Sequence, residues 1–183
     1  MNRTQLFFRS ISEVVGGNGM AVIVLTDKEA KRAVSVVCDN AMKWQIGMRH
    51  NARNRKETFL PEVMTALLTD VVSLAGYEIT VSDIVDGEYQ TAIINKDTLV
   101  GHKIRLSDAV LLSLVSDIPI YMDNRLMYRQ SSPYNAETDR MAIPINTLAT
   151  DKLKEELDKA IETENYRLAS QIKEELNNRE KTL

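Results

Sequence analysis

The pattern of apolar and polar residues in the first part of the chain predicts a pair of strands. Residues 19–26 form a short apolar run rich in β-branched side chains, which is typical of a buried strand. A polar turn at residues 27–31 separates it from a second β-branched run at residues 32–38. The two runs predict a β-hairpin, although Ala30 and Ala33 leave a helical alternative open for the second run.

The clearest helical pattern covers residues 60–75. Eight apolar residues recur there at the i, i+3, i+4 and i+7 spacing of one helix face, namely Leu60, Val63, Met64, Leu67, Leu68, Val71, Val72 and Ala75. Pro61 suits the first helical turn, and Gly76 suits a left-handed position after the last turn. A stripe this wide predicts a helix that packs on a large core rather than one that presents a functional surface.

Residues 79–105 predict three short antiparallel strands. Alternation at residues 79–83, the turn Asp86-Gly87 and the run at residues 89–94 indicate a hairpin with a type I′ turn. Residues 99–105 continue as a third strand, and connections this short favour antiparallel pairing.

A second helix is predicted at residues 106–115, where apolar residues return to helical spacing. Ser107 is the expected N-cap, and Asp108 lies in the first turn, where the helix dipole favours a negative charge. Residues 118–122 return to extended chain, with Pro119 at a strand start or on an edge strand.

The last fifty residues predict a linker and a helical hairpin. Residues 131–148 are polar and are interrupted by Pro133 and Pro144. Two sets of apolar residues then follow, each on one helical face, namely Leu153, Leu157, Ala160 and Ile161, and Leu168, Ala169, Ile172 and Leu176. The hairpin is too small for a core of its own, so we expect its apolar stripe to bind a partner protein.

The predicted fold is therefore α+β, with a mostly antiparallel sheet and packed helices at residues 1–130. A linker at residues 131–148 leads to the C-terminal α-helical hairpin at residues 149–183. The apolar stripes exceed what one thin sheet can cover, so we also expect a homo-oligomer.

The composition argues against several classes of protein, namely disulfide-bonded, zinc-binding, membrane and secreted proteins. The chain has 183 residues, a single cysteine and two histidines, which exclude an internal disulfide and disfavour a zinc site. No apolar run approaches the length of a membrane span, and the N-terminus lacks a signal-peptide core. We therefore expect a cytoplasmic protein with no membrane association.

The charge balance limits any role in nucleic-acid binding to a local patch. The formal net charge of −3 gives no overall basic surplus, which phosphate binding usually requires. One acid-free cluster contains Lys43, Arg49, His50, Arg53, Arg55 and Lys56. It is either a solvated basic loop or the lip of a DNA or RNA groove, in which Arg49, Arg53, Arg55 and Lys56 make the contacts.

A candidate catalytic set comes from the acids and the cation near the two predicted helices. Phosphodiester hydrolysis needs carboxylates on a divalent metal, or a general base and a cation. In the functional alternative, Asp108 binds Mg²⁺ or Mn²⁺, Arg105 contacts a phosphate and Glu62 supplies a second acid. In the structural alternative, Asp108 complements the helix dipole and pairs with Arg105. Trp44 is either a base-stacking residue or an anchor in the core or an interface.

The C-terminal hairpin resembles the UVR motif of bacterial excision-repair proteins, which also occurs in adaptors and chaperones of bacterial proteolysis. The matching residues are Leu153, Leu157, Ala160, Ile161, Glu164, Asn165, Tyr166, Leu168, Ala169, Ile172 and Lys173. The resemblance implies contact with a protein partner, for which Leu157, Ile161, Tyr166, Leu168 and Ile172 are the expected residues.

The larger part of the chain, residues 3–130, resembles the bifunctional nuclease family of bacterial and plant proteins, to which DNase and RNase activity is attributed. Residues 105–112 match the family stretch Arg-Pro-Ser-Asp-Ala-Ile-Ala-Leu, and residues 83–89 match its strand–turn–strand signature ending in Asp-Gly-x-Tyr. The domain order, with a UVR hairpin after this domain, is also common in the family.

The chain departs from the family at three places. Leu106 replaces the proline, and residues 58–63 lack the histidine and aspartate that enter the long helix, so that Glu62 is the only acid nearby. Residues 34–39 replace the usual Leu-Pro-Ile-x-Ile-Gly strand, and only Ala41 remains of the Glu-Ala that follows. A nuclease site inherited from this family would therefore be reduced.

Three functions remain open. The first is metal-assisted DNase or RNase activity, which predicts an open cluster of Glu62, Asp108 and Arg105. The second is a non-catalytic adaptor, which predicts that these groups are paired and that the hairpin binds a protein. The third is a small-ligand or stress-sensing module, which no residue pattern favours.

Overall fold

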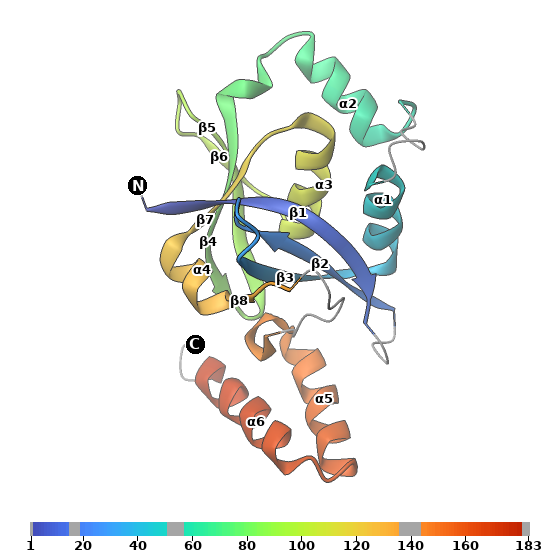
Figure 1. Cartoon of the computed structure of the whole chain (residues 1–183), viewed down its shortest axis with the longest axis vertical. Helices are drawn as coiled ribbons and strands as arrows, with labels where there is room; N and C mark the ends of the chain where they lie inside the picture. The colour runs from blue at the N-terminus through green and yellow to red at the C-terminus, as the bar shows by residue number, and fades with distance from the viewer. Residues whose placement is uncertain (1, 15–18, 51–56, 136–143, 181–183) are drawn as a thin grey trace.

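The computed structural model describes residues 2–14, 19–50, 57–135 and 144–180 and has a mixed α+β fold (Figure 1). The strands are β1 (Arg3–Glu13), β2 (Met20–Thr26), β3 (Arg32–Asp39), β4 (Tyr77–Val85), β5 (Glu88–Asn95), β6 (Gly101–Lys103), β7 (Ile120–Asp123) and β8 (Ser131–Pro133). The helices are α1 (Asn40–His50), α2 (Leu60–Thr69), α3 (Leu106–Ser116), α4 (Asn124–Gln130), α5 (Thr150–Glu162) and α6 (Tyr166–Glu180). Two 3₁₀ turns, η2 (Leu74–Gly76) and η3 (Ile145–Thr147), complete the described elements.

The strands form one sheet in the order β6-β5-β4-β7-β1-β2-β3-β8. All neighbouring pairs are antiparallel except β4 and β7, which are parallel. The predicted α+β class with a mostly antiparallel sheet is therefore confirmed. The C-terminal helices α5 and α6 form the predicted hairpin-like pair below the sheet (Figure 1).

The main hydrophobic core contains residues from β1 to β5 and β7 and from α1, α3 and α4, among them the buried Ile23, Ile46, Ile79, Val110 and Met122. Among the described residues, none from α2, α5 or α6 belongs to it. The helices α1 and α3 contact each other and several strands, so they close the core over the sheet.

The predicted hairpin of residues 19–38 is confirmed by β2 and β3, which pair along their whole lengths. The helical alternative for the second run is excluded, because residues 32–39 are extended and almost all are buried or half-buried. Strand β1 and helix α1 have no counterpart among the predicted elements. The half-buried residues of β1 do not alternate cleanly, and α1 follows β3 without a polar turn between them.

The region of β4, β5 and β6 agrees with the predicted strands. Asp86 and Gly87 have φ values of 50° and 83°, as the predicted type I′ turn requires. Pro119 directly precedes β7, so it stands at a strand start, and its carbonyl oxygen accepts the Ile79 N–H at 2.8 Å. Strand β7 lies inside the sheet, between β4 and β1.

The predicted N-cap of α3 is wrong by two residues. Arg105, rather than Ser107, occupies the N-cap position in extended conformation, and Ser107 is buried in the first turn. Leu106 therefore stands at the first helical position, where a proline is readily accommodated because its missing N–H has no helical partner. Asp108 lies in the first turn as predicted.

The prediction for residues 60–75 is wrong in extent and in burial. The helix α2 ends at Thr69, a 3₁₀ turn occupies Leu74–Gly76, and Gly76 does not adopt a left-handed conformation. No residue of α2 is buried. The predicted core helix instead presents its apolar stripe to solvent.

The predicted linker contains ordered structure. Ser131–Pro133 forms the edge strand β8 on β3, and the Tyr134 N–H donates to the Lys31 carbonyl oxygen at 2.9 Å. After the undescribed residues 136–143, η3 leads into the hairpin, whose interior contains Leu153, Ala160, Ala169 and Ile172. Among the described residues, no helix has the length and apolar character needed to cross a membrane.

Candidate functional site

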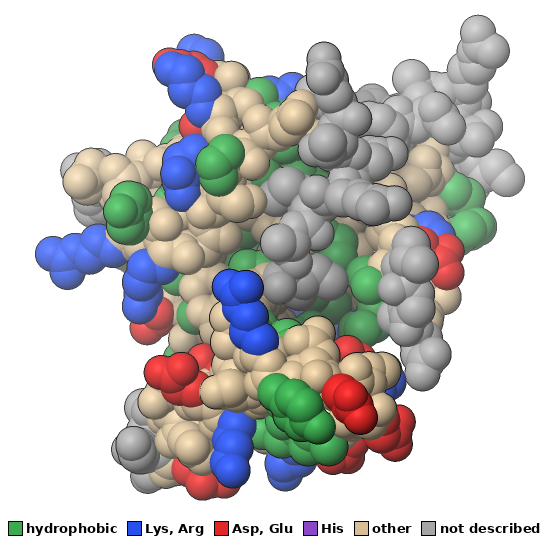
Figure 2. Space-filling model, turned by 60° about the horizontal axis from the view of Figure 1, so that its bottom comes forward, with side chains coloured by type: hydrophobic (Ala, Val, Ile, Leu, Met, Phe, Trp, Pro, Cys, Tyr) green, Lys and Arg blue, Asp and Glu red, His purple; other side chains and the backbone are tan. Residues whose placement is uncertain are grey.

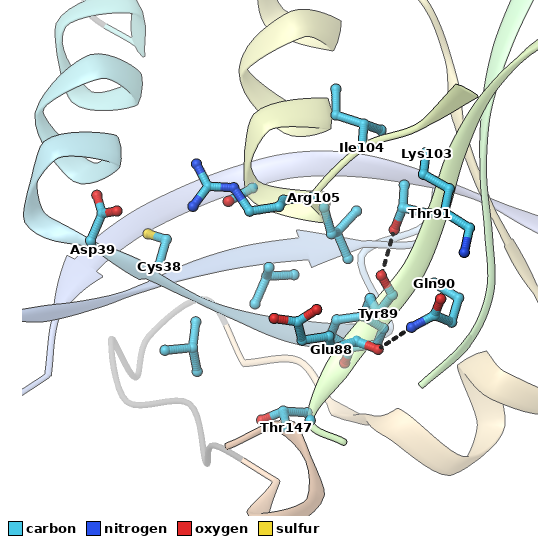
Figure 3. A pocket seen from close by; sticks show the side chains of 15 residues that line it. Cys38, Asp39, Glu88, Tyr89, Gln90, Thr91, Lys103, Ile104, Arg105 and Thr147 are labelled. Carbon is cyan, nitrogen blue, oxygen red and sulfur yellow. Dashed lines mark hydrogen bonds between the residues drawn. The ribbon is translucent and has the colours of Figure 1, made fainter. Parts of the chain in front are cut away.

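A pocket of about 470 Å³ lies between the end of β3, the start of β5 and the segment that joins β6 to α3 (Figure 3). Thr147 of η3 adds to its wall from the root of the hairpin. Four strands separate β3 from β5 in the sheet, yet the Tyr89 hydroxyl lies 3.4 Å from the Ser35 carbonyl oxygen. The sheet therefore curls so that β3, near one end of the strand order, approaches β5, near the other end. Such curling follows from the cumulative twist of adjacent strands.

The pocket brings together three stretches that are far apart in the sequence. They are the end of β3 up to Asp39, the turn and strand at residues 87–91, and residues 103–107 at the start of α3. Two of these stretches overlap the segments that carry the family resemblance, at residues 87–89 and 105–107. Parts of both segments therefore meet at one cavity.

Arg105 is the central cation of this pocket. Its Nε and Nη2 atoms donate to the two carboxylate oxygens of Asp108 at 2.6 and 3.2 Å, so the predicted contact between them forms. The side chain of Arg105 remains 69% exposed, whereas that of Asp108 is 32% exposed. The pair thus fixes the guanidinium at the pocket while leaving part of it open to a ligand.

Carboxylates dominate the surroundings of this guanidinium. The hydrogen bond and charge of Asp108 raise the pKa of Arg105, and the charges of Asp39 and Glu88 raise it further. Figure 3 shows the Arg105 side chain reaching toward Asp39 and Cys38, with Glu88 on another wall of the pocket. Lys103 also lines the pocket, but its side chain points away from that of Arg105 (Figure 3).

Cys38 lines the same pocket as a neutral thiol. Partial burial and the nearby charge of Asp39 raise the pKa of Cys38 to about 11. A thiol in this state is a poor nucleophile at neutral pH, because the thiolate is the reactive form. Burial also raises the pKa of Tyr89 far above neutrality, so its hydroxyl stays protonated.

Glu62 does not join Arg105 and Asp108 and pairs instead with Arg49. The Arg49 Nε and Nη2 atoms donate to the Glu62 carboxylate at 2.7 and 2.6 Å. The Arg49 Nη1 atom donates to the carbonyl and side-chain oxygens of Gln45 at 2.7 and 2.6 Å, and the guanidinium lies over the Phe59 ring. The three candidate catalytic residues are therefore divided between two ion pairs.

The candidate nucleic-acid contacts are only partly described. The Arg49 side chain is 4% exposed and its donors are directed at Glu62 and Gln45. Arg53, Arg55 and Lys56 lie outside the described residues. Lys43, in the same basic cluster, donates to Glu13 at 2.7 Å.

Acidic side chains in the described part of the chain do not form a protein-only metal centre. No group of three or more histidine, cysteine, aspartate or glutamate residues is arranged there to hold a metal ion. Asp108, the predicted metal ligand, has both oxygens engaged by Arg105. Among the described residues, the carboxylates that line the pocket are those of Asp39 and Glu88.

The candidate partner-binding residues differ in exposure. Ile161 and Tyr166 are 52% and 68% exposed, and Leu157 and Leu168 are half-buried. Ile172 is only 2% exposed because it packs inside the hairpin. Figure 2 shows an apolar patch on the hairpin, next to acidic side chains.

Sequence reasoning did not select Asp39, Glu88, Lys103 or Thr147 as site residues. Glu88 lies inside the strand–turn–strand signature, and Asp39 ends the strand that precedes Ala41. The sequence therefore contained a signal for each of these two residues, but only the curl of the sheet shows that Asp39 and Glu88 lie in the same pocket as Arg105.

The fold and the pocket define a curled α+β domain with a polar cavity and an appended helical hairpin. The family model of the bifunctional nuclease domain matches residues 23–135, which span β2 to β8 apart from the first residues of β2. This match covers more than half of the chain, so the chain belongs to the bifunctional nuclease domain family. A search of curated proteins finds no match to the chain.

Proposed function

We propose that the chain binds a nucleic acid at the pocket around Arg105 and hydrolyses its phosphodiester bonds there. The observation that carries this proposal is the convergence of the family-like stretches on one pocket with a partly exposed arginine. Membership of the bifunctional nuclease domain family supports a nucleic acid as the class of ligand.

Arg105 is the proposed phosphate ligand. Two of its donor nitrogens contact Asp108, which leaves its third nitrogen, Nη1, to donate to a phosphate oxygen. Hydrogen bonds between a guanidinium and a phosphate are charge-assisted and are stronger than those between neutral groups. Asp108 acts in this scheme as a positioning residue, because it holds the arginine in place without touching the substrate.

The carboxylates of Asp39 and Glu88 would repel a phosphate unless a proton or a cation lies between them. Mg²⁺ commonly binds through one or two carboxylates together with substrate phosphates rather than in an all-protein cage. Asp39 and Glu88 are the residues proposed to hold Mg²⁺ or Mn²⁺ in this way. The ion would supply positive charge to the phosphate, and one of the two carboxylates would accept the proton of the attacking water.

The test is a nuclease assay of purified protein on single-stranded DNA, double-stranded DNA and RNA, with Mg²⁺, Mn²⁺ or a chelator. We expect Arg105→Ala to lower the rate by about a hundredfold or more, because a charge-assisted phosphate contact is lost. The matched control is Arg129→Ala, since the Arg129 side chain is 60% exposed and also forms an ion pair, with Asp83 at 3.4 Å. Equal rates for the wild type and Arg105→Ala would refute the site.

The hairpin supports a second function, that of an adaptor. Its two exposed apolar side chains, Ile161 and Tyr166, flank the bend between α5 and α6. Exposed apolar residues on a small helical module are typical of protein-binding surfaces. We expect Ile161→Asp to abolish capture of a partner protein while the nuclease rate stays unchanged. The control is Val100→Asp, because Val100 is 54% exposed and Ile161 is 52% exposed. Capture that is equal in both variants would exclude this surface.

A further inference from the structure

Helix α2 and the turn that follows it expose an unusual amount of apolar side chain. We define the α2 face as the seven residues Leu60, Val63, Met64, Leu67, Leu68, Val71 and Val72. Their exposed fractions range from 38% for Val63 to 76% for Val71. Half of the exposed large hydrophobic side chains in the described part of the chain belong to this one short segment.

The helix directs its apolar stripe away from the domain. Glu62 points inward to the buried Arg49, and Thr65 is half-buried beside it, whereas the seven apolar residues face outward. A surface helix normally buries its apolar stripe and exposes its polar side. The reversed orientation leaves the stripe in water unless another apolar surface covers it.

The α2 face is large enough for a specific interface. Its exposed area is on the order of 600 Å², which reaches the upper end of the largest apolar patches on monomers. Complete coverage of two such faces would remove up to about 1,200 Å² from water, which is the lower limit for specific interfaces.

The chemistry of the face favours a second copy of this chain as its occupant. The only charged residue of α2 is Glu62, which is directed inward to Arg49. Asp70 at the C-cap is the only other charge between Leu60 and Val72, so the face offers little charge for a differently charged partner to complement. Leu60, Met64 and Leu68 lie four residues apart in α2, which is the spacing of a ridge that packs into the grooves of an equivalent helix. A two-fold contact therefore places apolar residues against apolar residues along the whole length of α2.

The location of the face is also compatible with pairing of two intact molecules. Helix α2 lies at the end of the molecule opposite to the hairpin (Figure 1). None of its residues lines the Arg105 pocket. Trp44 of α1, 56% exposed and in edge contact with Phe59 at 6.1 Å, extends the apolar surface next to the N-terminus of α2.

We propose that the α2 face pairs with the α2 face of a second copy, which makes this chain a homodimer with the two pockets and the two hairpins free. Sedimentation equilibrium of the full chain at 5 to 100 µM would test it. The wild type is expected at twice the chain mass of 20.7 kDa, and Leu67→Glu at the mass of one chain. Val100→Glu is the matched control, because Val100 is 54% exposed and Leu67 is 57% exposed, and it should remain dimeric.

A charge-swap experiment tests whether identical faces meet. Leu67→Glu and Leu67→Lys should each be monomeric, and their equimolar mixture should recover the dimer. Circular dichroism spectra equal to that of the wild type verify that both variants are folded. A monomeric wild type, a dimeric Leu67→Glu variant or a mixture that stays monomeric would each overturn the proposal.

Discussion

Two arginine–carboxylate pairs in this domain share their chemistry and differ in burial. The side chains of Arg49 and Glu62 are 4% and 17% exposed, whereas those of Arg105 and Asp108 are 69% and 32% exposed. Removal of one partner from a buried pair leaves an uncompensated charge in a region of low dielectric constant, whereas an exposed pair is screened by water. The first pair therefore stabilises the attachment of α2, and the second is available for a ligand.

This difference predicts unequal losses of stability for two substitutions. Glu62→Ala should lower the free energy of unfolding by about 3 kcal/mol, because Arg49 stays buried without its partner. Asp108→Ala should lower it by about 1 kcal/mol or less, because the lost pair is exposed. Urea denaturation followed by circular dichroism measures both values, and equal losses would contradict this assignment of roles.

The raised pKa of Cys38 predicts that the free energy of unfolding depends on pH. Its pKa of about 11, against an ordinary value of 9.0, keeps the thiol protonated through neutral pH. Because the folded-state pKa is raised, the unfolded chain loses its proton first, and stability should fall as the pH rises from about 9 to about 11.

The same pKa predicts slow alkylation of Cys38. At pH 8 the thiolate fraction should be about a hundredfold smaller than that of an unfolded cysteine, since the two pKa values differ by about two units. Iodoacetamide labelling of the native protein and of the protein in 8 M urea compares the two rates. Equal rates would show that the thiol is not held in its neutral form by the fold.

The sequence predicted the contact between Arg105 and Asp108 but not the carboxylates that surround it. The first contact is local, because the two residues are three positions apart at a strand-to-helix corner. Asp39 and Glu88 reach the same pocket only through the curl of a sheet whose order places four strands between β3 and β5. Pairwise spacing in the sequence contains no information on that curl.

At the scale of the elements, local patterns predicted strands well and burial poorly. The β2–β3 hairpin and the Asp86-Gly87 turn follow from β-branched runs and turn residues, which act over a few positions. The apolar stripe of residues 60–75 predicted a core helix, yet α2 turns this stripe outward. An apolar periodicity identifies a face that must be covered and does not say by which surface.

Gly87 lies where the turn between β4 and β5 contacts the segment that precedes α5, although the sequence analysis places these two regions in separate parts of the chain. Its φ is +83°, and a Cβ atom there would lie 2.3 Å from the Leu148 carbonyl oxygen at the root of the hairpin. Gly87→Ala should therefore cost about 1–3 kcal/mol of strain and displace Leu148 from the β4–β5 turn.

Thermal denaturation and limited proteolysis measure this effect. The variant should unfold several degrees lower than the wild type, and cleavage near residues 148–150 should accelerate. Gly76→Ala is the control, because nothing lies within 4 Å of a Cβ atom at that position. Similar behaviour of the two variants would argue against a close contact at Gly87.

At the scale of the whole molecule, three surfaces lie on different parts of the fold. The Arg105 pocket lies between the two sides of the curled sheet, the exposed Ile161 and Tyr166 lie on the hairpin, and the α2 face lies at the opposite end (Figure 1). A substitution on one surface can thus be tested without altering the other two. The hairpin and the pocket are still linked at one point, because Thr147 lines the pocket and Leu148 contacts the Gly87 turn.

Removal of the hairpin tests how far the two parts fold independently. Truncation after residue 144 removes η3, α5 and α6, none of which contributes to the main hydrophobic core among the described residues. The shortened chain should therefore unfold in one cooperative transition, with a midpoint within about 5 °C of the corresponding wild-type transition, because the lost contacts are few.

Ile172→Asp in the full chain should act in the same way, since it places a charge at a position of 2% exposure inside the hairpin and leaves the sheet intact. Differential scanning calorimetry of the three proteins distinguishes the outcomes. Loss of the cooperative transition in the truncated chain would mean that the main domain needs the hairpin in order to fold. The substitution at Ile172 would then unfold the whole protein.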